Sequence, residues 1–152
     1  MQFIFHTDGI KITHKKDSLL LGENIFISDY QIFYPGEYEI GGVFLQSKKI
    51  GKNNLYRFEL DGFSIVYFRD GSVINEENKV LKESGTGDIL ILENMSKKEM
   101  ENFINIFDPK VVFVRGSLEE WQGSAIEVKE NSKINLDQKD LLESERRVFV
   151  FS

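Results

Sequence analysis

YPGEYEIGGVFL, residues 34–45, combines a sharp corner with an extended segment that two glycines interrupt. Proline fixes φ and glycine accepts a positive φ, so Pro35-Gly36 predicts the centre of a type II turn. Gly41-Gly42 inside a strand pattern predicts a bulge or a close approach by another backbone, because residues without a Cβ weaken a strand. The run therefore predicts a turn followed by a strand that bends and resumes.

Two carboxylates in this run are spaced i, i+2, which places Glu37 and Glu39 on the same side of a strand. Such a pair suits acid–base chemistry or metal binding. Exposed carboxylates on strands are far commoner than catalytic pairs, so the structural interpretation is preferred here. Glu37 and Glu39 are kept as candidates for an alternative site only.

Upstream of the run, an Asp-Gly pair between two apolar segments predicts a hairpin. With Asp8-Gly9 as its two-residue turn, Phe5 opposes Ile12 and the apolar side chains share one face. This register places His6 and His14 on opposite faces, so the two histidines do not share a metal unless the register slips by one residue.

Downstream, a second Asp-Gly pair predicts another hairpin, with Asp61-Gly62 at its turn and Phe58 opposite Ile65 on a core face. This hairpin ends in the polar sequence RDGS at residues 69–72. Strand ends of this kind carry side chains to functional sites, but a plain turn at Asp70 is the preferred interpretation.

The second half of the chain has the pattern of buried parallel strands. Residues 89–92 and 111–114 are continuous apolar runs, as expected of strands covered on both faces. Ser96 to Phe107 lies between them, with a capping box and apolar residues at i, i+3, i+4 and i+7, and predicts a helix. The sequence therefore predicts a right-handed βαβ unit, preceded by a short helix over residues 76–83.

Composition narrows the class of protein. One domain over residues 1–152 is expected, because this length suffices to bury a large core and no repeat or low-complexity linker divides it. The net charge is −6 with no cluster of Lys or Arg, which argues against nucleic-acid and anionic-membrane surfaces. Without cysteine there is neither a disulfide nor a thiolate metal site. The start lacks the basic and apolar regions of a secretion signal, so a cytoplasmic location is expected, with no membrane span.

The order of these segments resembles the bacterial metallo-β-lactamase-fold proteins of the small lactonase-like group. The resemblance runs from about Asp29 to the C-terminus and rests on PGEYEIGGVFLQ, LYRFELDGFSIVYFRDGS, GDILIL, DPKVVFVRG and KINLDQKDLLESERRVFVFS. It implies an α/β, β-rich fold: a shortened αββα sandwich of two packed mixed sheets, with hairpins in the N-terminal half and a βαβ unit in the C-terminal half. In that superfamily a di-metal site opens at one edge of the sandwich.

The chain departs from this family at the metal site. The family's His-x-His-x-Asp-His signature belongs before the Pro-Gly corner, yet residues 19–34 contain no histidine. Asp70 falls at the bridging aspartate and is the only retained ligand position, and Arg115 stands where the last histidine is expected. Because one carboxylate does not hold a Zn²⁺ that takes four ligands, we expect no metal, no other cofactor and no metal-activated water.

These departures predict a catalytically inactive, metal-free relative of the hydrolases that serves as a binding or assembly module. The segment before Pro35 is short for the family, which would leave one face of the N-terminal sheet without cover. We therefore expect a homodimer or a dedicated protein partner that buries residues between Leu19 and Phe33.

The alternative is a hydrolase with a rebuilt site at the same sheet edge. It would act on a small anionic substrate held by Arg115 or Arg69. Its candidate residues are Asp70, Glu37, Glu39, His6 and Arg115.

Overall fold

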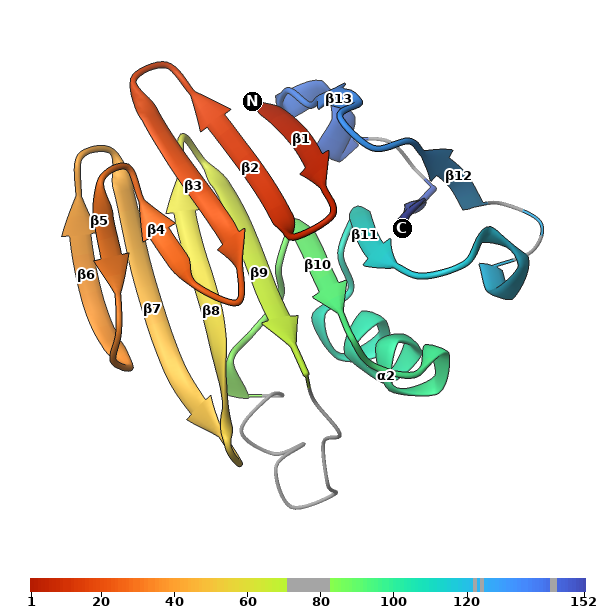
Figure 1. Cartoon of the computed structure of the whole chain (residues 1–152), viewed down its shortest axis with the longest axis horizontal. Helices are drawn as coiled ribbons and strands as arrows, with labels where there is room; N and C mark the ends of the chain where they lie inside the picture. The colour runs from red at the N-terminus through yellow and green to blue at the C-terminus, as the bar shows by residue number, and fades with distance from the viewer. Residues whose placement is uncertain (71–82, 122, 124, 143–144) are drawn as a thin grey trace.

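Two β-sheets packed face to face make up most of the molecule (Figure 1). The computed structural model describes residues 1–70, 83–121, 123, 125–142 and 145–152. The two-sheet, β-rich α/β architecture expected from the sequence is confirmed. The short helix expected over residues 76–83 lies almost wholly outside the described residues.

The first sheet has six strands in the order β13-β1-β2-β3-β4-β5, and each neighbouring pair is antiparallel. The strands span β1 Gln2–His6, β2 Gly9–His14, β3 Asp17–Gly22, β4 Ile25–Ile27, β5 Tyr30–Ile32 and β13 Lys133–Asn135. The short strand β13 has no signal of its own in the sequence.

The second sheet has eight strands in the order β12-β14-β11-β10-β9-β8-β7-β6. It is antiparallel from β6 to β9 and parallel from β9 to β12. The strands span β6 Gly36–Ile40, β7 Val43–Ile50, β8 Asn53–Leu60, β9 Phe63–Arg69, β10 Ile89–Glu93, β11 Val111–Arg115, β12 Ala125–Val128 and β14 Arg147–Phe151.

The predicted βαβ unit is confirmed, because β10 and β11 are parallel neighbours joined by helix α2, Lys97–Phe107. Ser96 caps the helix by accepting a 3.2 Å hydrogen bond from the Glu99 amide. The buried side chains of α2 pack on the outer face of the eight-stranded sheet, and they are Met100, Phe103, Ile104 and Phe107. Two 3₁₀ turns follow later in the chain, η1 Leu118–Trp121 and η2 Gln138–Leu142.

Aromatic side chains hold the sheets together. The ring of Phe113 on β11 lies 5.0 Å from that of Phe3 and 5.1 Å from that of Phe5, both on β1 of the opposite sheet. Phe5 also meets Phe151 at 5.0 Å. Aromatic pairs at these separations add to the free energy of area burial, so they help to hold β1 against β11 and β14.

The pairing predicted for the first hairpin is wrong by two residues. The turn residues are Thr7 and Asp8, and Phe5 pairs with Ile10 instead of Ile12. The glycine serves another purpose, since a Cβ on Gly9 would lie 2.5 Å from the backbone oxygen of Leu21 on β3. Gly9 is therefore needed for the close approach of two strands rather than for the turn.

The faces of this hairpin are as predicted. A shift of two residues keeps the alternation of side chains, so His6 and His14 remain on opposite faces. The side chain of His14 makes a 2.8 Å ion-pair contact with Asp61 at the β8–β9 turn, and His6 Nδ1 lies 3.1 Å from Asn131 Oδ1.

Both turn predictions for residues 34–45 need correction. Pro35 lies in a bend, and Gly36 has φ 147° as the first residue of β6, outside the range of a type II turn. Gly41-Gly42 is the turn between β6 and β7 rather than a bulge within one strand. The close approach is real but comes from a side chain, because Asp17 Oδ2 accepts a 3.2 Å hydrogen bond from the Gly42 amide.

The outer face of the six-stranded sheet has no helix over it in the described part of the chain. In Figure 1 strands β1 to β5 lie in front of the eight-stranded sheet with nothing drawn over them. None of the described helices has the length and apolar character needed to cross a membrane.

Candidate functional site

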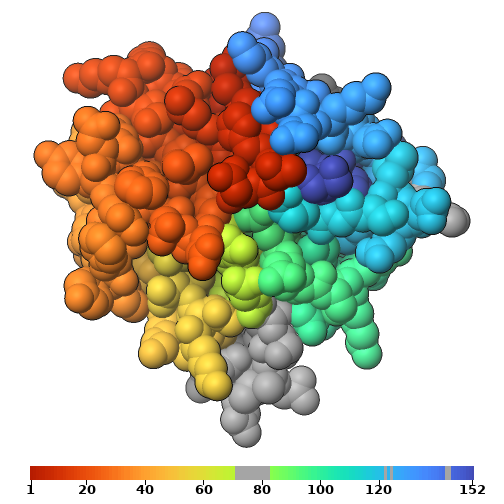
Figure 2. All heavy atoms as spheres, viewed as in Figure 1, coloured from red at the N-terminus to blue at the C-terminus, as the bar shows by residue number. Residues whose placement is uncertain are grey.

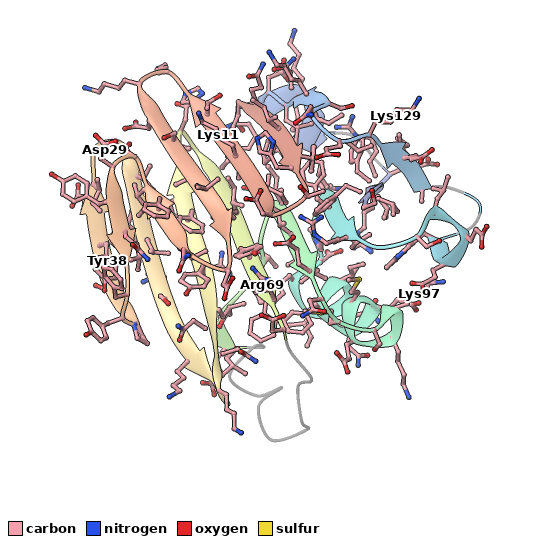
Figure 3. All side chains as sticks on the ribbon, viewed as in Figure 1. Lys11, Asp29, Tyr38, Arg69, Lys97 and Lys129 are labelled. Carbon is pink, nitrogen blue, oxygen red and sulfur yellow. The ribbon has the colours of Figure 1, made fainter. Side chains whose placement is uncertain are left out.

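Three parallel strands end in charged residues that form one row. In register, Glu93 at the end of β10 pairs with Arg69 at the end of β9. Arg69 is labelled in Figure 3. Leu92 pairs with Val114, so Arg115 at the end of β11 is the next residue along from the neighbour of Leu92. Alternation along each strand turns all three charged residues toward the six-stranded sheet. The row therefore lies at the edge of the inter-sheet core, at the carboxyl ends of parallel strands where ligands of α/β folds bind.

Glu93 is the buried centre of this row, with 3% of its surface exposed. Its Oε1 accepts a 2.5 Å hydrogen bond from Arg115 Nε, and its Oε2 accepts a hydrogen bond from the phenol of Tyr67. Burial raises the pKa of Tyr67 well above its ordinary value, and the charge and hydrogen bond of Glu93 raise it further. Tyr67 therefore keeps its proton and acts as a hydrogen-bond donor, and both carboxylate oxygens of Glu93 are occupied.

Arg115 links the two sheets through hydrogen bonds to backbone oxygens. Its Nη2 donates a 3.0 Å hydrogen bond to the backbone oxygen of His6 on β1, and its Nη1 donates a 2.7 Å bond to the backbone oxygen of Ser152. The guanidinium carbon lies 4.6 Å from the ring centre of Phe151, within cation–π distance. All three guanidinium nitrogens are thus bound to the protein's own framework.

Asp70 forms a second charged group beside the row. Arg69 Nε lies 3.1 Å from Asp70 Oδ2, an ion-pair distance without hydrogen-bond geometry, and the amide of Asn94 donates to Oδ1. Burial alone would lower the pKa of Arg69, but the neighbouring Tyr67, Asp70 and Glu93 outweigh it and raise that pKa, so Arg69 stays charged. Asp70 and Asn94 both have left-handed backbones, with φ 59° and 54°, which is a conformation that Asp and Asn tolerate best.

A surface hollow of about 520 Å³ opens over these groups. Its floor is formed by the strand ends, and its walls come from the β1–β2 turn of the other sheet and from the segment after β11. The lining residues are Thr7, Asp8, Arg69, Glu93, Asn94, Met95, Arg115, Gly116 and Glu120.

The structure brings together only part of the predicted alternative site. Asp70 and Arg115 reach the same sheet edge, but Glu37 and Glu39 are on β6, three strands beyond β9. Glu37 accepts a 3.3 Å hydrogen bond from Gln46 there. The residue His6 contributes its backbone oxygen, while its ring faces Asn131.

Glu93 and Tyr67 are not among the site residues predicted from the sequence. A signal for Glu93 was present, because it is the first charged residue after a strand of four apolar residues. The sequence carried no signal for Tyr67, because a tyrosine inside a strand gives the same pattern whether or not its hydroxyl donates a hydrogen bond to a carboxylate.

The residues at this edge do not fit a catalytic metal centre. Both oxygens of Glu93 and both oxygens of Asp70 face cations or donors of the chain itself. Among the described residues, no group of three or more His, Asp, Glu or Cys side chains is placed to hold a metal ion. Zinc normally takes three or four such ligands, so the donor set here is too small.

A solved structure with a similar fold comes from Thermotoga maritima and is described as a candidate Zn-dependent hydrolase of the metallo-beta-lactamase superfamily. The match covers 99% of this chain and 98% of that chain, with a TM-score of 0.64 and 15% sequence identity. No protein-family model and no curated protein sequence matches the chain. At this identity the likeness concerns the fold.

Proposed function

The chain has the metallo-β-lactamase fold, and within this fold we propose that it serves as a catalytically inactive, metal-free binding or assembly module. The observation that carries the proposal is the position of Arg115. Its guanidinium lies at the strand end where the resemblance places a metal-binding histidine, and it neutralises the buried Glu93. The permanent positive charge of Arg115 already balances the buried carboxylate of Glu93, so this carboxylate does not need a metal ion as its counter-charge.

The outer face of the six-stranded sheet supports a role in assembly. Strand register aligns one row of side chains across this face, from β13 to β5: Lys133, Ile4, Lys11, Leu20, Phe26 and Gln31. Leu20 is 40% exposed at the centre of the row, and in Figure 2 residues of β1 to β5 form the upper left part of the visible surface. A homodimer through this face would cover Leu20 and Phe26, and one patch would serve both subunits.

Metal content tests the catalytic part of the proposal. Protein purified without chelator should contain well under one equivalent of zinc, iron or manganese, measured by plasma mass spectrometry. Added Zn²⁺ should leave the melting temperature unchanged, because a ligand that binds only the folded state must raise it. Near-stoichiometric metal that is lost in Asp70→Ala would contradict the proposal.

A hydrolase with a rebuilt, metal-independent site is the second candidate, and the hollow above Arg69 and Glu93 favours it. Hydrolysis of small lactone or ester substrates that persists in EDTA and falls at least tenfold in Asp70→Asn would favour this candidate. Loss of activity with EDTA would instead indicate a contaminating or recruited metal.

A further inference from the structure

The charges around the hollow divide into engaged and unengaged groups. Arg115 is hydrogen-bonded to Glu93 and is fully engaged. Arg69 is only partly engaged, because its 3.1 Å contact with Asp70 lacks hydrogen-bond geometry and its side chain stays 28% exposed. The remaining charged lining residues are Asp8 and Glu120, and both are exposed. Neither has an ion-pair partner within the described ranges.

These two carboxylates stand on different walls. Asp8 belongs to the β1–β2 turn of the six-stranded sheet, whereas Glu120 belongs to η1 after β11 of the other sheet. Arg69, from the floor, lines the same hollow with its side chain 28% exposed. The hollow thus has a cationic group at the strand ends and carboxylates on its walls.

We propose that the hollow binds a small amphoteric ligand, an amino acid or short peptide, whose carboxylate meets Arg69 and whose ammonium group meets Asp8 and Glu120. This inference rests on the proposed function, since it assigns a ligand class to a site that holds no metal. A volume of about 520 Å³ lies within the range of small-molecule pockets.

The balance of charge decides against a simple anion. The lining contributes three carboxylates and two guanidinium groups, and Asp70 beside Arg69 adds a fourth carboxylate. A negatively charged ligand would therefore meet an excess of like charge. A purely cationic ligand would be repelled by the positive charge of Arg69. A ligand that carries both charges, with a neutral or positive total, satisfies both sets of groups.

Titration of ¹⁵N-labelled protein by two-dimensional NMR tests the proposal. The probes are L-lysine and the dipeptide Gly-Lys, with L-glutamate, acetate and methylammonium as comparisons at equal concentration and salt. We expect the first two to shift the amide resonances of Asp8, Asn94 and Gly116 with saturable curves, and the three comparisons to bind at least about tenfold more weakly, because each loses a charge-assisted hydrogen bond or gains repulsion.

Two substitutions assign the ends of the ligand. Glu120→Gln and Arg69→Gln should each weaken L-lysine binding about tenfold or more, whereas Glu119→Gln, the same charge change on the same 3₁₀ turn, should leave it unchanged. Equal weakening by Glu119→Gln, tight binding of acetate alone, or no saturable shift with either probe would overturn the inference. The metal measurement is independent of these outcomes, so a failed titration with metal-free protein would remove the ligand class and leave the inactive-module proposal in place.

Discussion

Arg115 ends a strand that otherwise consists of valine and phenylalanine, and it places a cation at the edge of an aromatic core. The charge is tolerated because Glu93 balances it and two backbone oxygens accept from the guanidinium. The pair is not expected to be a large source of stability in itself, since desolvation offsets much of the attraction between buried charges. Removal of the Arg115 side chain, however, leaves the buried carboxylate of Glu93 without a counter-charge.

We expect Arg115→Ala to lower the free energy of unfolding by about 2–4 kcal/mol, somewhat below the range for fully buried pairs because the arginine side chain is 21% exposed. The double variant Arg115→Met with Glu93→Leu should recover part of this loss, because no charge is then buried alone, although the buried Tyr67 hydroxyl loses its acceptor. Urea denaturation of the three proteins measures both effects. A double variant as unstable as the single one would show that geometry, rather than charge, is what Arg115 supplies.

A pH dependence follows from Tyr67. Its pKa is raised in the folded protein, so the folded state keeps the phenol proton at a pH where the unfolded chain loses it. The stability contributed by Tyr67 is therefore fully present below about pH 10, the ordinary tyrosine pKa, and is lost as the pH rises beyond it.

The measurement compares urea denaturation at pH 8 and pH 10.5 for the natural chain and for Tyr67→Phe. At pH 8 the variant should be less stable by about 1–3 kcal/mol, because Glu93 loses a donor. The difference should shrink at pH 10.5. Tyr30→Phe, at an exposed phenol, is the control and should show no such convergence.

At the level of elements, contacts between neighbouring strands decided where the first hairpin turns. Asp8-Gly9 is a strong turn signal, yet Gly9 is the first residue of β2. A glycine is needed at this position because β3 lies too close to Gly9 to leave room for a side chain. The reciprocal glycine is Gly22, where a Cβ would lie 2.6 Å from the backbone oxygen of Asp8. These contacts also fix the position of Asp8 on the wall of the hollow.

Gly9→Ala should lower the free energy of unfolding by about 1–3 kcal/mol, because the backbone oxygen of Leu21 cannot move aside as a flexible side chain does. Gly116→Ala is the matched control, since the nearest atom to its Cβ is 4.0 Å away and its φ is not positive. Thermal and urea denaturation measure both. Equal losses in the two variants would mean that strand approach is not the reason for Gly9.

For the whole molecule, the feature with the largest consequence is the uncovered face of the six-stranded sheet. The eight-stranded sheet has α2 on its outer face, whereas Leu20 and Phe26 of the other sheet lie under no described helix. Apolar side chains in a row across a sheet are a typical surface for self-association.

Light scattering at micromolar concentration should therefore give about twice the monomer mass of 17.6 kDa. Leu20→Lys should shift the protein to the monomer without loss of fold, because the side chain lies at the surface and not in the core. Ile126→Lys, at a 45% exposed position on β12, introduces the same charge elsewhere and should leave the dimer intact. A monomer mass for the natural chain would exclude the homodimer.

Local pattern determined most of the architecture. The parallel pair β10 and β11, the amphipathic helix between them and the register of the β8–β9 hairpin are all as predicted, because continuous apolar runs, a capping box and a tight turn each depend on residues close in the chain. The absence of histidine from residues 19–34 was equally visible, because it is read directly from the sequence.

Only the tertiary structure decided which side chains meet at this sheet edge. Glu93, Arg115 and Tyr67 are 22 and 26 residues apart in the chain, and their meeting depends on the register of parallel strands joined by long connections. The close contacts of Gly9 with Leu21 and of Gly41-Gly42 with Asp17 likewise join residues that are distant in sequence. Steric exclusion and the pairing of buried charges act between whichever groups the fold brings together, so sequence proximity carries no information about them.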